Sequence, residues 1–368
     1  MAGFPFMRQA EAFRSSLPFI LLLAVFILPC PMSAAAKPRP AIAFVHLLLP
    51  PGGEPHASPA GWIGSLDRAR DTLESLRIPT IVSSASPGNA EDLNELSEMD
   101  PEVLITTSPL LYAAACDVAK RSPNTVFFAC TDETVHDNMS GFQARTYEAH
   151  YLAGLIAGAL SEDGVIGYLA NDPYQSKASR LRNANAFTLG AQKSKAAIRV
   201  LYAPGNDSDE ELKTLIAAGA DIVDLERALP SLVERLREHS VRYVGTAGRT
   251  VDPLCLAAPE WEWSNAFGDL LTQVRFGIWR PRNVSYGIKE GVVGLSPFGP
   301  AVPETVRVRV REAKEAIRNG ASPFEGPVRD VSGSLRIAEG SVPDDATLRG
   351  MDWRVQGLEP LPLTPDGL

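Results

Sequence analysis

The sequence has few of the residues that build disulfide frameworks and metal centres. Four cysteines occur among 368 residues, at positions 30, 116, 130 and 255, and no C-x-x-C pair or His/Cys cluster suggests zinc. We therefore expect no metal and no cofactor. An exported protein could join Cys116 to Cys130, but cysteines this scattered make no framework, and buried free thiols are the expectation.

Common catalytic motifs are also missing. No G-x-S-x-G turn, P-loop or G-x-G-x-x-G turn follows an apolar run, and the five histidines, at 46, 56, 136, 150 and 239, form no pattern. We expect no catalytic residues and a protein that is not an enzyme. The net charge of −9 at pH 7 argues against nucleic acid as a partner.

One apolar run resembles a targeting signal. Arg8 and Arg14 precede the apolar residues 17–28, and small residues ending at Ala36 follow. This pattern predicts a secretory signal peptide over residues 1–36, cleaved near Ala36, and hence a periplasmic protein. Cys30 is an alternative site for lipid anchoring, but the prolines on both sides of it make a poor lipoprotein signal, so we expect a soluble exported protein.

A second apolar run, YLAGLIAGAL at 151–160, is too short for a membrane span, which takes about 20 residues. Charged residues flank it on both sides. We predict a core helix on which Gly154 and Gly158 share one face, so that a neighbouring backbone can approach closely, as where a helix lies on a sheet.

Short apolar runs alternate with helical segments from residue 40 onward, which predicts parallel sheets covered on both faces. Removing 36 of 368 residues leaves 332, a length that suits two domains. Polar breaks at 131–141 and 248–253 are typical of chain crossings between domains. The predicted fold class is α/β, with two parallel-sheet Rossmann-like domains joined by a multi-crossing hinge and a ligand cleft at the carboxyl ends of their strands.

The expected division follows those breaks. It places 37–140 plus 249–294 in the first lobe, 141–248 plus 295–330 in the second lobe, and 331–368 in a tail packed on the lobes.

Several blocks carry a family resemblance. RTYEAHYLAG (145–154), NANAFTLGAQ (183–192), PFEGPVRDVSG (323–333) and MDWRVQGLEP (351–360) occur in that order. Together they resemble the basic membrane protein (BMP, PnrA-like) family of ABC-transporter substrate-binding proteins, over roughly residues 40 to 360. The resemblance implies a type I periplasmic-binding-protein fold, a purine base or nucleoside as ligand, and an ABC permease and ATPase as partners.

The pocket departs from the family pattern more than the scaffold does. Relatives carry a G-W-T-x-x-H-D turn, of which this chain keeps Trp62 and Asp67 but has Leu66 for the histidine. Asp172 replaces an aromatic residue, and Arg249 falls on an acidic position. The candidate ligand-binding residues are Trp62, Asp67, Asp132, Phe142, Asn171, Asp172, Arg249, Asp252 and Trp261.

Their chemistry suggests two roles. Aromatic side chains can stack on a base, at about 1–3 kcal/mol each, which assigns Trp62, Phe142 and Trp261. Carboxylates, amides and guanidinium groups can bond the edge of a base, which assigns Asp132, Asn171, Asp172 and Arg249.

Structural roles are the alternatives. Trp62 and Phe142 could belong to the core, and Arg249 and Asp252 could pair with each other. Trp263, Phe187 and Tyr168 are expected to pack, His46 to be a satisfied core histidine, and Lys177, Arg180 and Arg182 to form a solvated helix face.

The function expected from the resemblance is ligand binding by hinge closure, in which a ligand that contacts both domains favours the closed form. Two alternatives stay open. The same exported receptor could serve a sensor instead of a transporter, or its altered pocket could take a ligand that is not a purine.

Overall fold

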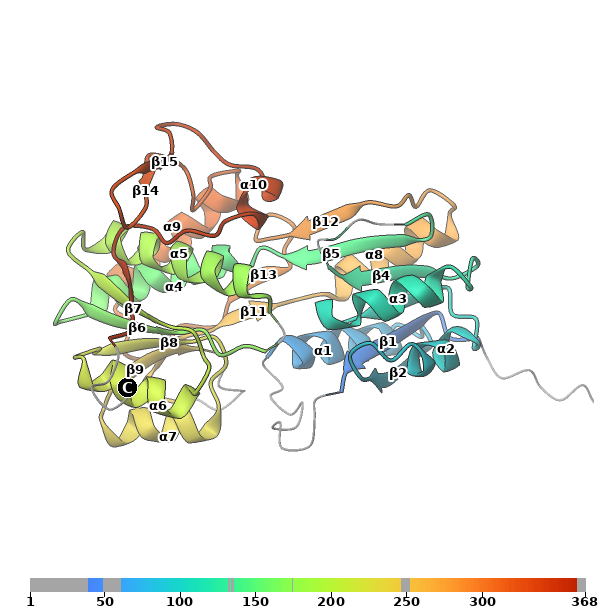
Figure 1. The fold of residues 1–368 in the computed structure, drawn as a ribbon, viewed down its shortest axis with the longest axis horizontal. Helices are drawn as coiled ribbons and strands as arrows, with labels where there is room; N and C mark the ends of the chain where they lie inside the picture. Colours follow the sequence, from blue (N-terminus) through green and yellow to red (C-terminus); the bar gives the residue numbers. More distant parts are fainter. Residues whose placement is uncertain are drawn as a thin grey trace, which may run out of the picture. The chain divides into compact units, whose positions relative to one another are not determined.

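The structure is a computed structural model that describes residues 39–48, 61–131, 133, 136–173, 175–245 and 252–362. The predicted signal peptide, Asp132 and Arg249 lie outside the described residues. Two six-stranded sheets, each with all its strands parallel, organise the rest of the chain (Figure 1).

The first sheet has the order β12-β5-β4-β3-β1-β2. Its strands are β1 (Ile42–Leu47), β2 (Thr80–Ala85), β3 (Val103–Thr106), β4 (Val126–Cys130), β5 (Met139–Ala144) and β12 (Asn283–Tyr286). The helices along this part of the chain are α1 (Trp62–Ser75), α2 (Glu91–Ser97), the short 3₁₀ helix η1 (Pro109–Leu111), α3 (Tyr112–Ala119) and α8 (Ser264–Arg275). Strands β1 and β3 are buried at every residue, which explains their unbroken apolar sequences.

The second sheet has the order β10-β9-β8-β6-β7-β16. Its strands are β6 (Val165–Leu169), β7 (Arg199–Ala203), β8 (Ile222–Leu225), β9 (Arg242–Gly245), β10 (Cys255–Ala257) and β16 (Leu358–Pro360). Helices α4 (Thr146–Leu160) and α5 (Lys177–Ser194) lie on one side of it, and α6 (Ser208–Ala217) and α7 (Pro230–Glu238) on the other (Figure 1).

Smaller elements complete the described chain. Strands β11 (Pro259–Trp261) and β13 (Val293–Leu295) pair antiparallel, as do β14 (Val328–Arg329) and β15 (Leu335–Ile337). Helices α9 (Glu304–Arg318) and α10 (Asp345–Arg349) belong to the last third of the sequence. No helix among the described residues is long and apolar enough to span a membrane.

The strands distribute differently from the expected lobe ranges at two points. Strand β10 falls within 249–294, the range assigned to the first lobe, yet it pairs with β9 in the second sheet. Strand β5 runs to Ala144 in the first sheet, past the expected boundary at residue 140. The predicted boundaries relied on polar breaks in the sequence. Strand β10 has only three residues and β5 continues directly into the crossing between the sheets, so neither is marked by such a break.

The predicted core helix over 151–160 is confirmed within α4. Its glycines face helix α5, where a Cβ added to Gly154 or Gly158 would overlap the backbone of Phe187 or Ala191. Gly190 returns the contact toward Tyr151. The close neighbour is therefore a second helix, and three glycines allow the two backbones to touch.

Candidate functional site

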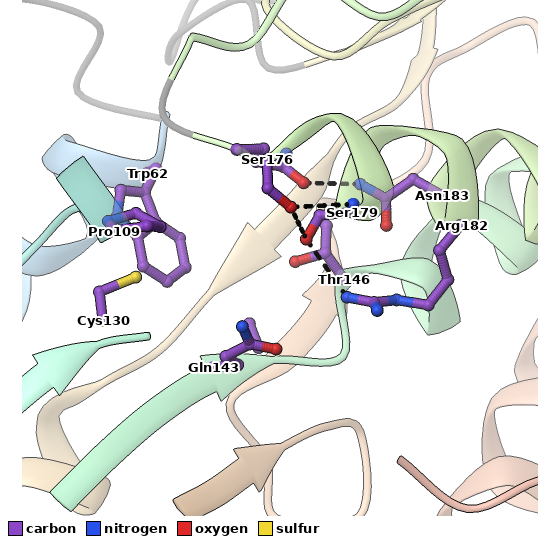
Figure 2. Close-up of a pocket in the computed structure, with 11 residues that line it drawn as sticks. Trp62, Pro109, Cys130, Gln143, Thr146, Ser176, Ser179, Arg182 and Asn183 are labelled. Carbon is purple, nitrogen blue, oxygen red and sulfur yellow. Dashed lines mark hydrogen bonds between the residues drawn. The ribbon is translucent and has the colours of Figure 1, made fainter. Parts of the chain in front are cut away.

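A cleft of about 610 Å³, which includes its open mouth, lies where elements of both sheets meet. One wall consists of the first residues of α1 and η1 and the last residue of β4, and a second wall comes from α5 and the turn before it. The lining residues, most of which Figure 2 labels, are Trp62, Pro109, Cys130, Gln143, Ala144, Thr146, Gln175, Ser176, Ser179, Arg182 and Asn183.

Of the predicted ligand-binding residues that the structure describes, Trp62 alone lines this cleft. Its indole Nε1 donates a 2.8 Å hydrogen bond to the carbonyl oxygen of Thr107. Two further indoles hold it edge-on, Trp261 at 5.7 Å and Trp263 at 5.3 Å between ring centroids. The ring is therefore fixed in place by its own protein before any ligand arrives.

Two predicted stacking residues belong to the core instead. Phe142 is 0% exposed and lies parallel to Trp62 at 6.5 Å, in the layer beneath it. Trp261 is 6% exposed, and its Nε1 donates to the Thr146 hydroxyl at 3.1 Å. Neither side chain lines the cleft, so the core alternative is the one the structure supports for Phe142. Trp263 packs in the core, as predicted.

The N-terminal part of α5 forms the polar wall. Ser176 caps the helix by accepting a hydrogen bond from the Ser179 backbone N–H at 3.1 Å. Arg182 donates to the Ser179 hydroxyl at 3.3 Å and to the Leu348 carbonyl at 3.2 Å. The prediction that Arg182 belongs to a solvated helix face is wrong, because the side chain is buried and borders the cleft.

Behind this wall, the side-chain amides of Gln175 and Asn183 donate hydrogen bonds to two carboxylates. Asn183 Nδ2 donates to Gln175 Oε1 at 2.8 Å and to Glu226 Oε1 at 3.3 Å. Gln175 Nε2 donates to Asp172 Oδ2 at 3.0 Å, and the Tyr168 hydroxyl donates to Glu226 Oε1 at 2.8 Å. Asp172, a predicted edge partner, is therefore connected to the cleft through Gln175.

Charged groups are buried in the same region. His150 Nδ1 lies 3.0 Å from Asp224 Oδ2, and both residues are almost fully buried. Burial lowers the pKa of His150, but the Asp224 carboxylate outweighs it, so that the pKa is raised. Burial raises the pKa of Glu226 to about 7, against the opposing charge of His150 and with the support of Asp172.

The remaining predicted residues in the described chain have structural partners. Asn171 bonds the backbone N–H and carbonyl of Arg227, each at 2.9 Å. Asp252 accepts hydrogen bonds from Arg237 at 2.7 Å and from Tyr243 at 3.0 Å. Neither residue lines the cleft, and their assignment as ligand contacts stays a prediction.

Asp67, a further predicted ligand-binding residue, pairs with His46. His46 Nε2 lies 3.2 Å from Asp67 Oδ1, and His46 Nδ1 lies 3.2 Å from the Thr107 hydroxyl. The prediction of a satisfied, buried His46 is confirmed. Cys116, Cys130 and Cys255 are all described, and none of them is in a disulfide.

Sequence reasoning missed most of the polar wall. Ser176, Ser179 and Asn183 recur at helical spacing in the first half of α5, so they share one face. That spacing was a usable signal, but polar residues at the start of a helix are also typical of a solvated surface. Gln143 and Thr146 flank the crossing between the sheets and carry no pattern.

Comparisons with known proteins agree with this architecture. The family described as "ABC transporter substrate-binding protein PnrA-like" matches residues 66–219. A purine-binding protein of Brucella abortus (strain 2308) is 28% identical over 344 residues, which cover 89% of this chain and 95% of the relative. Over these residues this chain is similar to the PnrA-like family of ABC transporter substrate-binding proteins, and over most of its length it is similar to a protein named for purine binding.

A second similar protein is named for a different ligand. A putative ABC transporter glucose-binding protein of Haloferax volcanii is 27% identical over 307 residues, 77% of this chain and 78% of the relative.

Solved structures confirm the predicted fold. An ABC transporter solute-binding protein from Conexibacter woesei superposes with a TM-score of 0.60 at 17% identity, covering 76% of this chain and 97% of its own. Another from Aeropyrum pernix K1 gives 0.60 at 16% identity, with coverage of 84% and 95%. This chain therefore has the type I periplasmic-binding-protein fold.

Proposed function

We propose that this substrate-binding protein takes a purine base or nucleoside into the cleft and delivers it to an ABC permease and its ATPase. The observation that carries the proposal is a fixed indole, Trp62, facing a cleft whose other wall consists of amides, hydroxyls and a guanidinium group. Stacking on an aromatic ring and hydrogen bonds to the edge are how a planar heterocycle is held. The Brucella relative supports the ligand class.

We further propose that each sheet is the centre of one lobe and that ligand binding closes the hinge between them. Trp62 comes from a helix of the first sheet, whereas Arg182 and Asn183 come from a helix on the second. A ligand that contacts both walls favours the closed form by its additional contacts there. Asp132 and Arg249 stay candidate edge partners from the crossing segments.

A sugar is the second candidate ligand. The Haloferax relative is named for glucose, and an aromatic platform beside amides and hydroxyls also suits a sugar. The two candidates differ in what the polar wall would bond, because a sugar offers several hydroxyls and a purine offers fixed ring donors and acceptors.

Thermal melting of residues 37–368 with purine bases, nucleosides, riboflavin, sugars and amino acids tests the proposal. A ligand at about a hundred times its Kd adds roughly 2.7 kcal/mol to the free energy of unfolding. That raises Tm by several degrees in a chain of this size. We expect shifts with purines alone. A shift with sugars alone would assign the second candidate, and a flat response to purines would reject the first.

A further inference from the structure

Asn183 presents one particular atom to the cleft. The residue is 1% exposed, and its Nδ2 donates to both Gln175 Oε1 and Glu226 Oε1. An amide nitrogen carries two hydrogens, so these two bonds use both of them. The amide oxygen is left on the other side, and in Figure 2 it points toward the side where Arg182 lies.

The neighbours decide this orientation. When the Glu226 carboxyl is ionised, as it mostly is above about pH 7, it only accepts hydrogen bonds, so the atom of Asn183 that faces it is then the nitrogen. Gln175 has its own nitrogen engaged by Asp172, so it too offers an oxygen to Asn183. Asp172 and Glu226 therefore orient the amides of Gln175 and Asn183 in the same way, with each amide nitrogen toward its carboxylate.

None of the hydrogen bonds between described residues involves Asn183 Oδ1, and the residue lines the cleft. A ligand that displaces water from this oxygen without donating to it loses a hydrogen bond, whereas a ligand with a donor there keeps one. Next to it, Arg182 can only donate. The wall therefore places this acceptor beside the guanidinium donors of Arg182.

We propose that Asn183 Oδ1 accepts a hydrogen bond from an N–H of the bound heterocycle, and that Glu226 and Asp172 are positioning residues that hold Asn183 in this orientation. The ligand class is a purine that carries an N–H beside a ring or exocyclic acceptor. This inference rests on the proposed function. It assigns a specificity role to acidic residues that touch the ligand only through an amide.

Two matched pairs of probes test it by isothermal titration at about pH 8, where the Glu226 carboxyl is mostly ionised. Hypoxanthine carries an N–H at N1 and adenine carries one at N6, both on the six-membered-ring edge, whereas 6-methoxypurine and N6,N6-dimethyladenine keep the ring and its imidazole N–H but lose that edge donor. We expect the protein to prefer the N–H form by tenfold or more in the pair that it binds, because the methylated form leaves Asn183 Oδ1 unpaired.

Glu226→Gln is the decisive variant. A glutamine at this position can donate as well as accept, so the Asn183 amide is free to turn over, and the preference should fall to within about threefold. Asn183→Leu should abolish the preference. The control is Asp224→Asn, at a buried acid two residues earlier, within β8, that contacts His150 and not Asn183, and it should keep the full preference.

Melting without ligand establishes that each variant is folded, and Glu226→Gln, nearly isosteric, serves if Asn183→Leu does not fold. An unchanged preference in folded Glu226→Gln would overturn the inference. If purines do not bind but glucose does, the proposed function fails separately. The acceptor role then stands only if Glu226→Gln and Asn183→Leu weaken glucose binding at least fivefold, and it is overturned if they do not.

Discussion

The side chains that are buried around the two sheets differ in kind. Around the first sheet the interior is a stack of rings, with Phe128 and Phe142 parallel at 4.6 Å and Trp263 and Phe267 parallel at 5.5 Å. Around the second sheet the interior holds charge, in the His150–Asp224 pair and in Glu226. The cleft has one wall from each.

This difference separates two tasks of a binding site. Stacked rings fix the position of Trp62 but impose no direction on a ligand in the plane of its ring. Hydrogen bonds to buried carboxylates fix which atom of an amide faces the cleft, and so they impose direction. One wall of the cleft therefore contributes affinity, and the other contributes orientation. The substitutions and pH measurements below test this division.

The largest effect is expected from Phe142→Ala. Truncating a fully buried phenylalanine removes its burial and leaves a cavity, so the free energy of unfolding should fall by about 3–5 kcal/mol. Urea denaturation measures this loss, and ligand titration of the folded protein should show a smaller change in Kd. A large loss of affinity with little loss of stability would indicate that Phe142 contacts the ligand and is not a core residue.

Gly154→Ala should cost about 3 kcal/mol, because the added Cβ meets the Phe187 backbone carbonyl and the two helices must separate. Its matched control is Gly268→Ala in α8, a helical glycine with open space at the Cβ position. That change should raise stability by up to about 1 kcal/mol. Equal effects of the two substitutions in urea denaturation would disprove the close packing of α4 on α5.

The buried charges around the second sheet should make the free energy of unfolding depend on pH. The pKa of Glu226 is about 7 in the folded protein, above the ordinary value of 4.5. The native state thus holds this proton more tightly than the unfolded chain does, so the free energy of unfolding falls as pH rises from about 4.5 to about 7. The full loss is about 3 kcal/mol. The titratable groups that face Glu226 are His150, Tyr168, Asp172 and Asp224.

Glu226→Gln removes this ionisation while keeping the shape of the side chain. The variant should therefore gain stability relative to the native sequence between pH 5 and pH 8, by up to the same amount. Urea denaturation at both pH values measures the gain. A difference that does not change with pH would mean that Glu226 titrates at its ordinary pKa.

The smallest effect concerns Trp62→Leu, which removes the stacking surface but keeps an apolar side chain. Ligand binding should weaken by about 1–3 kcal/mol, or roughly 5- to 150-fold in Kd. Stability should change less than in Phe142→Ala, because Trp62 is only partly buried. A stability loss as large as that of Phe142→Ala would assign Trp62 to the core.

Patterns local in the sequence predicted the scaffold well. Apolar runs at β1 and β3 and the glycine spacing in α4 follow from burial on both faces and from helical periodicity. Side-chain partners were harder. Asn171 and Asp252 were chemically suited to a ligand, but they bond Arg227 and Arg237, which lie 56 and 15 residues away along the chain.

The α/β class, the family resemblance and the expectation of a cleft at strand ends follow from the sequence, because they depend on periodicity and on residues close together in the chain. Which polar residues face that cleft depends on tertiary packing. Asn183 and Glu226 stand 43 positions apart, and their hydrogen bond exists because the fold brings α5 next to the residue that follows β8. A donor or acceptor acquires a direction only from its partner, and the fold chooses the partner.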